Sequence, residues 1–153
     1  MHRIAEFSKV SKNIYANEGY EDIILPRRAT KGSAGYDFFA PCDFVIPKNG
    51  SVIVKTGVRA KIDEDWVLCI FPRSGMGFKY GVRLANTAGI IDSDYYGAEN
   101  EGHIMIKLTG TDEDVFVPKG KAFAQGIFLP YGITVDDNCF EERTGGLGST
   151  DRK

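Results

Sequence analysis

Residues Ser51 to Ile62 read Ser-Val-Ile-Val-Lys-Thr-Gly-Val-Arg-Ala-Lys-Ile, and this stretch indicates the fold class. Apolar and basic side chains alternate along it, which is the period-two pattern of a β-strand with one buried face. The apolar set is Val52, Val54, Val58, Ala60 and Ile62, and the basic set is Lys55, Arg59 and Lys61. The run Trp66 to Phe71 is apolar throughout and precedes Pro72, as expected of a strand buried on both faces.

Short apolar runs punctuated by glycine and proline continue along the rest of the chain, which contains 18 glycines. The further strand candidates are Ile4 to Val10, Phe44 to Ile46, Gly102 to Leu108, Val115 to Val117, Phe123 to Leu129 and Ile133 to Val135. No segment has a sustained helical period, and the best candidate is one or two turns starting at Ser74, which could cap them. The pattern therefore predicts an all-β fold, either a β-sandwich, a jelly roll or a small barrel, with one short helix.

The bulk composition indicates one folded domain in a chain of 153 residues that is 42% hydrophobic and 26% charged. A net charge of −2 argues against direct, non-specific nucleic-acid binding. The N-terminus lacks an apolar signal core and no apolar run is long enough to span a membrane, so we expect a cytoplasmic protein. Cys42, Cys69 and Cys139 match neither a disulfide framework nor a metal motif.

The last residues differ in composition from the rest of the chain. Residues 141–153 are rich in glycine and contain one large apolar residue, Leu147. We therefore expect a folded domain over residues 1–140 and a mobile tail over residues 141–153.

The stretch Asn86 to Gly97 reads Asn-Thr-Ala-Gly-Ile-Ile-Asp-Ser-Asp-Tyr-Tyr-Gly and is the strongest candidate for chemistry. Asp92 follows two aliphatic residues that read as the end of a buried strand, so its carboxylate can be held rigidly and still meet water, as a general base requires. An aromatic pair three residues later could form the floor for a flat ligand. The alternative is an Asp-rich surface turn.

Four more segments carry polar groups in unusual settings. Asp37 lies between aromatic residues in a predicted strand, facing either water or a cation. The turn Pro72-Arg-Ser-Gly-Met-Gly77 could cradle a phosphate with backbone N–H groups, although an ordinary capped turn has the same residues. Gln125 is an amide in an apolar strand and needs a partner, either a ligand or a loop. The stretch Arg143 to Thr150 could wrap an anion or be a flexible tail.

Taken in their order along the chain, the five segments closely resemble the five motifs of the trimeric dUTPases, and the resemblance spans roughly residues 4 to 150. It implies a jelly roll, or distorted β-barrel, that assembles as a homotrimer with active sites shared between subunits. It further implies hydrolysis of dUTP to dUMP and pyrophosphate by water attack on the α-phosphorus. That reaction keeps uracil out of DNA and supplies dUMP for thymidylate synthesis.

The resemblance also implies roles for individual residues. Asn86 and the backbone near Gly89 would read the uracil within a β-hairpin. Tyr95 would pack under the deoxyribose and exclude a 2′-hydroxyl, and Asp92 would orient and deprotonate the water. Asp94 would support the turn.

The remaining motifs would handle the triphosphate. Arg73, Ser74 and Gly75 would hold the phosphates, and Gln125 would contact the α-phosphate or the water. Mg²⁺ would be held mainly by the triphosphate, with Asp37 reaching it through water. The tail would close over the ligand through Arg143, Leu147, Gly148, Ser149 and Thr150.

The chain departs from the family pattern at three places. Leu147 stands where an aromatic residue is usual, Asp151 replaces a glycine, and the stretch Ala98 to Gly102 looks longer than the common turn. Two other functions stay open on the sequence. One is a dCTP deaminase, which shares the fold but needs a glutamate base near the pyrimidine. The other is a regulator that uses nucleotide binding to control a protein partner.

Overall fold

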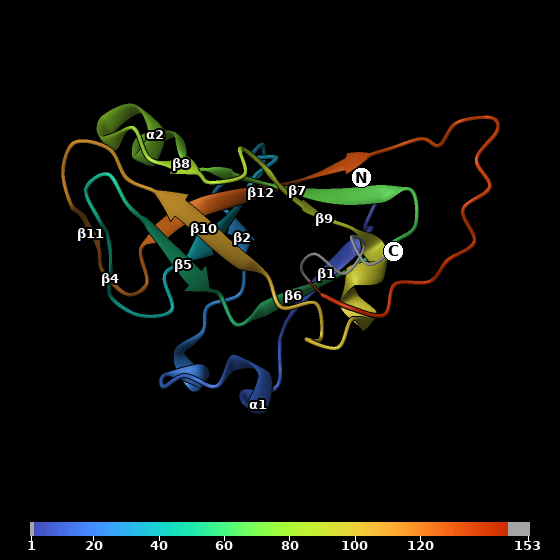
Figure 1. The fold of residues 1–153 in the computed structure, drawn as a ribbon, viewed down its shortest axis with the longest axis horizontal. Coiled ribbons are helices and arrows are strands. Elements are labelled where there is room, and N and C mark those ends of the chain that lie inside the picture. Colours follow the sequence, from blue (N-terminus) through green and yellow to red (C-terminus); the bar gives the residue numbers. More distant parts are fainter. Residues whose placement is uncertain (1, 147–153) are drawn as a thin grey trace.

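The computed structural model describes residues 2–146, which fold into short strands with little helix (Figure 1). The strands are β1 Ala5–Lys9, β2 Arg27–Arg28, β3 Tyr36–Phe39, β4 Phe44–Ile46, β5 Ser51–Lys55, β6 Val58–Ile62, β7 Trp66–Pro72, β8 Arg83–Leu84, β9 Gly89–Ile91, β10 Met105–Thr109, β11 Val115–Val117 and β12 Ala122–Pro130. The helices are α1 Lys12–Tyr15 and α2 Ser74–Tyr80, with 3-10 turns η1 Tyr20–Asp22 and η2 Ser93–Gly97. The all-β prediction with one short helix after Pro72 is confirmed, and α1 adds a single further turn.

A five-stranded sheet in the order β2-β3-β12-β7-β9 carries the predicted site residues Asp37, Gly89 and Gln125, and Arg73 and Asp92 directly follow β7 and β9. Its strands β12 and β7 form a long antiparallel pair, because β7 is apolar along its whole length and is covered on both faces. Gly126 lets the two strands meet the core closely, since an added Cβ would lie 2.8 Å from Leu68. Smaller ladders pair β1 with β6, β4 with β11, and β5 and β8 with β10.

The stretch that alternates from Ser51 to Ile62 forms two strands instead of one. Gly57 adopts a left-handed φ of +72° between β5 and β6, and an added Cβ there would collide with Ile23. The two halves consequently join different sheets, β5 with β10 and β6 with β1. The apolar face is preserved across the break, because Val54, Val58 and Ala60 are all buried.

The helix α2 begins where expected but is not capped as expected. Ser74 is its first helical residue, and Arg73 occupies the N-cap with no side-chain hydrogen bond to the helix. The helix ends at Gly81, whose φ of 64° places its N–H on the carbonyl of Gly77 at 2.9 Å.

The predicted strand Ile133 to Val135 is wrong for the isolated chain. Beyond β12 the chain runs as an extended arm away from the sheets and returns toward η2 (Figure 1). Three apolar residues on the arm are exposed, namely Ile133 at 75%, Val135 at 108% and Phe140 at 91%. No neighbouring strand of the described chain pairs with this segment, so its β-propensity goes unused. No helix among the described residues is long and apolar enough to cross a membrane.

Candidate active site

Asp92 directly follows β9, as its position after Ile90 and Ile91 predicted. The strand is not buried as expected, because β9 is at the edge of its sheet and Ile90 is 59% exposed. Ile91 pairs with Leu68 on β7, and the carbonyl of Asp92 then accepts a hydrogen bond from the N–H of Tyr95 at 3.2 Å. The backbone is therefore fixed on both sides of the residue. Its carboxylate remains about half exposed, at 51%. Asp92 thus combines a rigid backbone with access to water.

Arg143 bridges the two carboxylates of this segment. Its Nη2 lies 2.8 Å from Asp92 Oδ2, and its Nε donates to Asp94 Oδ1 at 2.9 Å. The guanidinium also lies 5.8 Å from the centre of the Tyr95 ring. The arm that leaves β12 therefore returns its first tail arginine to the predicted general base. The contact of Asp94 is with this arginine, so a role for Asp94 in supporting the turn stays a prediction.

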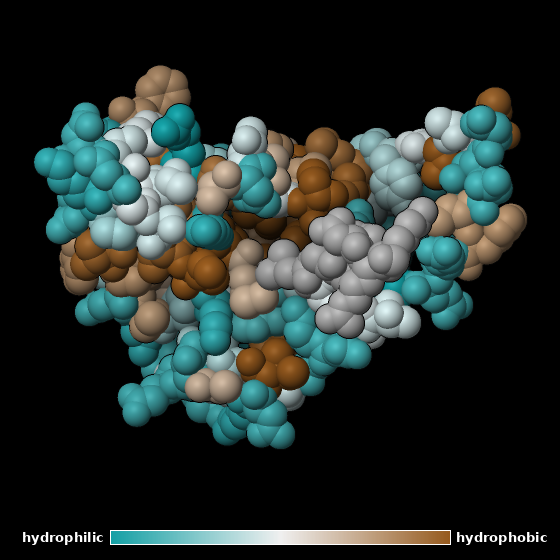
Figure 2. Space-filling model, viewed as in Figure 1, coloured by the Kyte–Doolittle hydropathy of each residue, from teal (hydrophilic) through white to brown (hydrophobic). Residues whose placement is uncertain are grey.

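Two adjoining cavities open beside Asp92. The larger, about 380 Å³, is mainly apolar and includes Asn86 and Gly89 in its wall. The smaller, about 130 Å³, is lined by Asp92, Tyr95 and Arg143. Ile91 and Met105 line both cavities. Figure 2 shows apolar surface gathered in the middle of this face, where β9 and β10 lie.

The segment that holds the predicted base-reading residues is not the expected β-hairpin. β8 pairs with β10 and β9 pairs with β7, so the two strands on either side of Asn86 belong to different sheets. Thr87, with a φ of 69°, turns the chain between them. The segment then continues into the 3-10 turn η2 instead of a second hairpin strand. The short strands β8 and β9 pair with the longer strands β10 and β7 and not with each other. The alternation of side chains in the sequence could not reveal this pairing.

Tyr95 and Tyr96 have different environments. Tyr95 is 8% exposed, and its hydroxyl donates to the carbonyl of His103 at 2.8 Å while accepting from Asn100 Nδ2 at 2.8 Å. The ring of Tyr96 instead lies 3.5 Å beneath the guanidinium carbon of Arg59. Only Tyr95 lines the cavity beside Asp92, as the sequence interpretation of the pair expected.

A second cluster gathers the predicted phosphate and metal residues. Arg73 Nε lies 3.1 Å from Asp37 Oδ1, and Asp37 is the register partner of Gln125 across β3 and β12. The Gln125 amide donates to the carbonyl of Pro72 at 3.1 Å, so this buried-strand amide has found a protein partner. Ser74 and Gly75 are exposed beside it at the start of α2.

The two clusters lie at opposite ends of β7 (Figure 1). Asp92 follows Ile91, which pairs with Leu68 near the start of β7. Gln125 pairs with Phe71 near the end of β7, and Arg73 follows Pro72, the last residue of that strand. The distance from Leu68 to Pro72 along an extended strand is roughly 13 Å. Both clusters were predicted, but the isolated chain does not bring them together.

His103 is a buried group that the sequence interpretation did not single out. It is 3% exposed, and its Nε2 accepts the N–H of Gly57 at 2.9 Å, which requires the neutral ring. Burial lowers the pKa of His103 and the charge of Lys55 lowers it further, against an opposing effect of Glu101. A lone histidine in sequence gives no signal for this role. Burial also raises the pKa of the Cys69 thiol, and the nearby charge of Asp92 adds to the effect.

A third cavity, about 630 Å³, lies elsewhere, between β1 and the outer part of the large sheet. Phe7, Tyr36 and Phe128 line it and pack against one another. No predicted site residue is in its wall. We therefore place the candidate site at the two clusters on β7. The predicted tail residues Leu147, Gly148, Ser149 and Thr150 lie outside the described residues.

Comparison with known proteins identifies similar chains. Residues 21–150 match the family model described as dUTPase. The deoxyuridine 5'-triphosphate nucleotidohydrolase of Lactococcus lactis subsp. lactis is 38% identical over 152 residues, which cover 97% of this chain and 98% of that protein. The crystal structure of dUTPase from Streptococcus mutans has a TM-score of 0.68 and 34% identity, covering 86% of this chain and 98% of that one. A mutant dUTPase from phage phi11 of S. aureus, described with a structural Mg(II) ion, has a TM-score of 0.68 at 19% identity, covering 91% and 98%.

Proposed function

The chain belongs to the dUTPase family, and from that premise we propose how its residues divide the hydrolysis of dUTP to dUMP and pyrophosphate. The observation that carries the proposal is the position of Asp92. Its carboxylate is about half exposed and lines the smaller cavity, which shares Ile91 and Met105 with the larger, apolar cavity whose wall includes Asn86 and Gly89. The proposed general base, Asp92, therefore lies next to the pocket that we propose for the uracil ring.

We assign the uracil to the larger cavity. Its volume, about 380 Å³, falls in the range of small-ligand sites, and apolar walls with a few polar groups are typical of such sites. Asn86 and the backbone around Gly89 would supply the hydrogen bonds that distinguish uracil. Tyr95 would lie under the sugar. A wrong base would leave buried polar groups unpaired, which is a strong basis for selectivity.

We assign the water to Asp92 as its general base. Attack on the α-phosphorus concentrates charge on the phosphate oxygens, so most of the catalysis comes from positioning and electrostatics. In this structure Arg143 pairs with Asp92 and Asp94. On binding, Arg143 would exchange these carboxylates for the γ-phosphate, which leaves Asp92 free to take the proton of the water.

The phosphate cluster of Arg73, Ser74, Gly75 and Gln125 would complete the site from another subunit. Attack at the α-phosphorus needs the water of Asp92 and the phosphate ligands within a few ångströms of each other. In one chain they are separated by about four residues of strand, roughly 13 Å. The exposed Ile133, Val135 and Phe140 on the arm also need an apolar partner. Both observations support a homotrimer with shared sites.

Magnesium fits this arrangement as a cation carried by the substrate. Within residues 2–146, no group of three His, Cys, Asp or Glu side chains gathers closely enough to hold a metal ion. Asp37 offers one carboxylate in the phosphate cluster, already paired with Arg73. Mg²⁺ keeps several waters and commonly binds one or two carboxylates plus phosphates, so Asp37 would contact its water shell. When bound, the ion would neutralise charge on the triphosphate.

A substrate panel tests this assignment. Pyrophosphate release is measured from dUTP, UTP, dTTP and dCTP, each with Mg²⁺ and with excess EDTA. We expect dUTP to be turned over in strong preference to the other three, and EDTA to abolish most of the activity. Ammonia release from dCTP, or equal turnover of UTP and dUTP, would contradict the assignment of the pocket.

A further inference from the structure

The stretch Ala98 to His103 folds back onto η2 and encloses the end of the Tyr95 side chain. Hydrogen bonds from Ala98 N to the carbonyl of Tyr95 at 3.1 Å and from Glu101 N to that of Ala98 at 2.8 Å tighten the turn. Gly102 is required, because its φ is 70° and an added Cβ would lie 2.6 Å from the carbonyl oxygen of Tyr95. The longer turn is therefore a structured enclosure.

The Tyr95 hydroxyl is held from two sides by this stretch. It accepts from Asn100 Nδ2 at 2.8 Å and donates to the carbonyl of His103 at 2.8 Å. Asn100 is itself oriented, because its Oδ1 accepts the N–H of Gly102 at 3.2 Å. That bond fixes which amide atom faces the tyrosine. The phenol thus has both a fixed donor and a fixed acceptor, and its ring has little freedom to shift.

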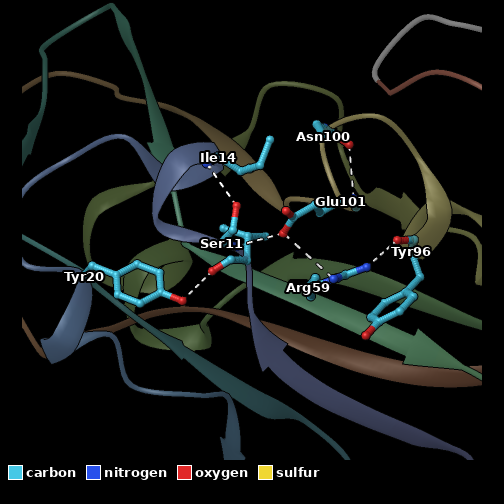
Figure 3. Close-up of polar contacts among 9 residues, drawn as sticks. Ser11, Ile14, Tyr20, Arg59, Tyr96, Asn100 and Glu101 are labelled. Atoms are coloured by element: carbon cyan, nitrogen blue, oxygen red, sulfur yellow. Dashed lines mark hydrogen bonds and ion pairs between the residues drawn. The ribbon is translucent and has the colours of Figure 1, made fainter.

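The enclosing turn is tied to the rest of the fold by charged groups (Figure 3). Glu101 Oε2 accepts the N–H of Ser11 at 2.7 Å and lies 3.9 Å from Arg59 Nη1. Arg59 Nη2 donates to the carbonyl of Tyr96 at 2.6 Å and stacks on the Tyr96 ring. Arg59 on β6 therefore holds the chain at Tyr96, before the turn, and Ser11 holds it at Glu101. Asn100 lies between these two contacts in the sequence.

We propose that Asn100 is a positioning residue for sugar selectivity, acting through the Tyr95 hydroxyl. The inference rests on the proposed role of Tyr95 beneath the deoxyribose. A ring that excludes a 2′-hydroxyl works only while it stays in place, since a shift of the ring away from the sugar opens room for an oxygen. Asn100 prevents that displacement from outside the cavity, as it lines neither of the two pockets beside Asp92.

The test compares the kcat/KM ratio for dUTP over UTP among matched variants. Asn100→Asp keeps the acceptor for Gly102 but loses the amide donor. The single proton of the Tyr95 hydroxyl must then go either to the new carboxylate or to the carbonyl of His103, so the hold on Tyr95 is disturbed while the contact that shapes the turn is kept. Asn100→Ala removes both contacts, and Tyr95→Phe removes only the hydroxyl. Glu99→Gln, an exposed change in the same turn, is the control.

We expect Asn100→Asp and Asn100→Ala to lower the ratio about five- to tenfold, as loss of one hydrogen bond would, mainly by improving UTP turnover. Glu99→Gln should keep the wild-type ratio. In a Tyr95→Phe background the Asn100 changes should have no further effect, because their target is gone. The melting temperature of each variant is measured alongside to exclude global unfolding.

A purely structural role predicts a different result. Asn100→Ala would then slow dUTP and UTP equally and Asn100→Asp would match wild type, which would overturn the proposal. Additive effects of the Asn100 and Tyr95 changes would overturn it as well. These failures are distinct from failure of the proposed function, which would appear as absent dUTP turnover or absent sugar selectivity in the wild-type protein.

Discussion

At the scale of single residues, position in the fold separates groups that look equivalent in sequence. Asp92 and Asp94 are two residues apart and both pair with Arg143, yet only Asp92 lines the small cavity. Tyr95 and Tyr96 are adjacent, yet one faces that cavity and the other packs under Arg59. The resemblance to the dUTPase motifs assigned roles to Asp92 and Tyr95, and these two are the members of each pair that line the small cavity.

Replacing Asp92 with asparagine tests the general base. The amide of Asp92→Asn keeps the shape of the side chain but cannot take a proton, so we expect kcat for dUTP to fall about a thousandfold, within the range for loss of a general base. Steady-state pyrophosphate release is the measurement. Asp94→Asn serves as the comparison and should lose much less, because Asp94 is outside the cavity wall. Equal losses in the two variants would remove the distinction between them.

His103 should make stability depend on pH. Burial holds its folded-state pKa below the ordinary value of 6.5, so the unfolded chain binds the proton first as pH falls. The free energy of unfolding is therefore greatest above that value and decreases as pH drops through 6.5 toward the folded-state pKa. We therefore expect the melting temperature to fall as the pH decreases below about 6.5.

His103→Gln should flatten that decline, since its amide oxygen can accept the Gly57 N–H without titrating. Thermal unfolding at several pH values provides the measurement. His2→Gln, a change at an exposed residue, is the control and should leave the slope as in wild type. A slope unchanged by His103→Gln would mean that other groups cause the decline.

At the scale of elements, alternation of side chains predicted where strands lie but not how they pair. The inward-facing positions from residue 52 to residue 62 keep a period of two, with Thr56 as their one polar member, so the period itself does not mark the break at Gly57. That break depends on a left-handed φ and on Ile23, which packs there from a distant part of the chain. The hairpin expected around Asn86 failed for a similar reason, because pairing depends on which longer strands are nearby.

The candidate site was predictable as separate motifs but not as a geometry. Asp37, Arg73 and Gln125 converge because β3, β7 and β12 are neighbours, which the order of strands in the sheet decides. The enclosure of Tyr95 by Asn100 could not be read from sequence, since an asparagine in a polar turn is common. Nor could the contact of Arg143 with Asp92, which joins residues far apart in the chain.

Deletion of residues 142–153 tests the tail as an element. We expect the melting temperature to stay close to wild type, because Leu147 is the only large apolar residue removed and the ion pairs lost with Arg143 are to the half-exposed carboxylates of Asp92 and Asp94. Turnover of dUTP should fall by about a hundredfold, since phosphate positioning is lost. Arg143→Ala in the full chain shows how much of that loss one arginine causes. Full activity in the truncated protein would reject the closing role of the tail.

At the scale of the whole molecule, the single chain keeps the Asp92 cluster and the Arg73 cluster apart, and we propose that each is part of a site completed by another subunit. Each part has its own anchoring, the Asp92 cluster by η2 and the Arg73 cluster by α2, and β7 separates them (Figure 1). The exposed apolar residues of the extended arm also favour assembly with another subunit, because such a surface is normally covered by a partner.

Mixing two inactive variants tests whether sites are shared. Asp92→Asn and Gln125→Ala proteins are each expected to be nearly inactive, and they are co-refolded in equal amounts. With Asp92 and Gln125 supplied by different chains, about one quarter of the sites regain both groups if the chains assort at random. The measurement is dUTP turnover per chain, with separately refolded variants as the control. No gain on mixing would place both groups of a site on the same chain.

The separation of the two clusters along β7 has a genetic consequence. A chain that carries damage in both clusters would spoil sites in its neighbours as well as its own share. A defective allele expressed beside a normal one should therefore be partially dominant, with total activity falling below the normal gene dosage. An allele that also lost the exposed arm would be excluded from assembly and should be recessive.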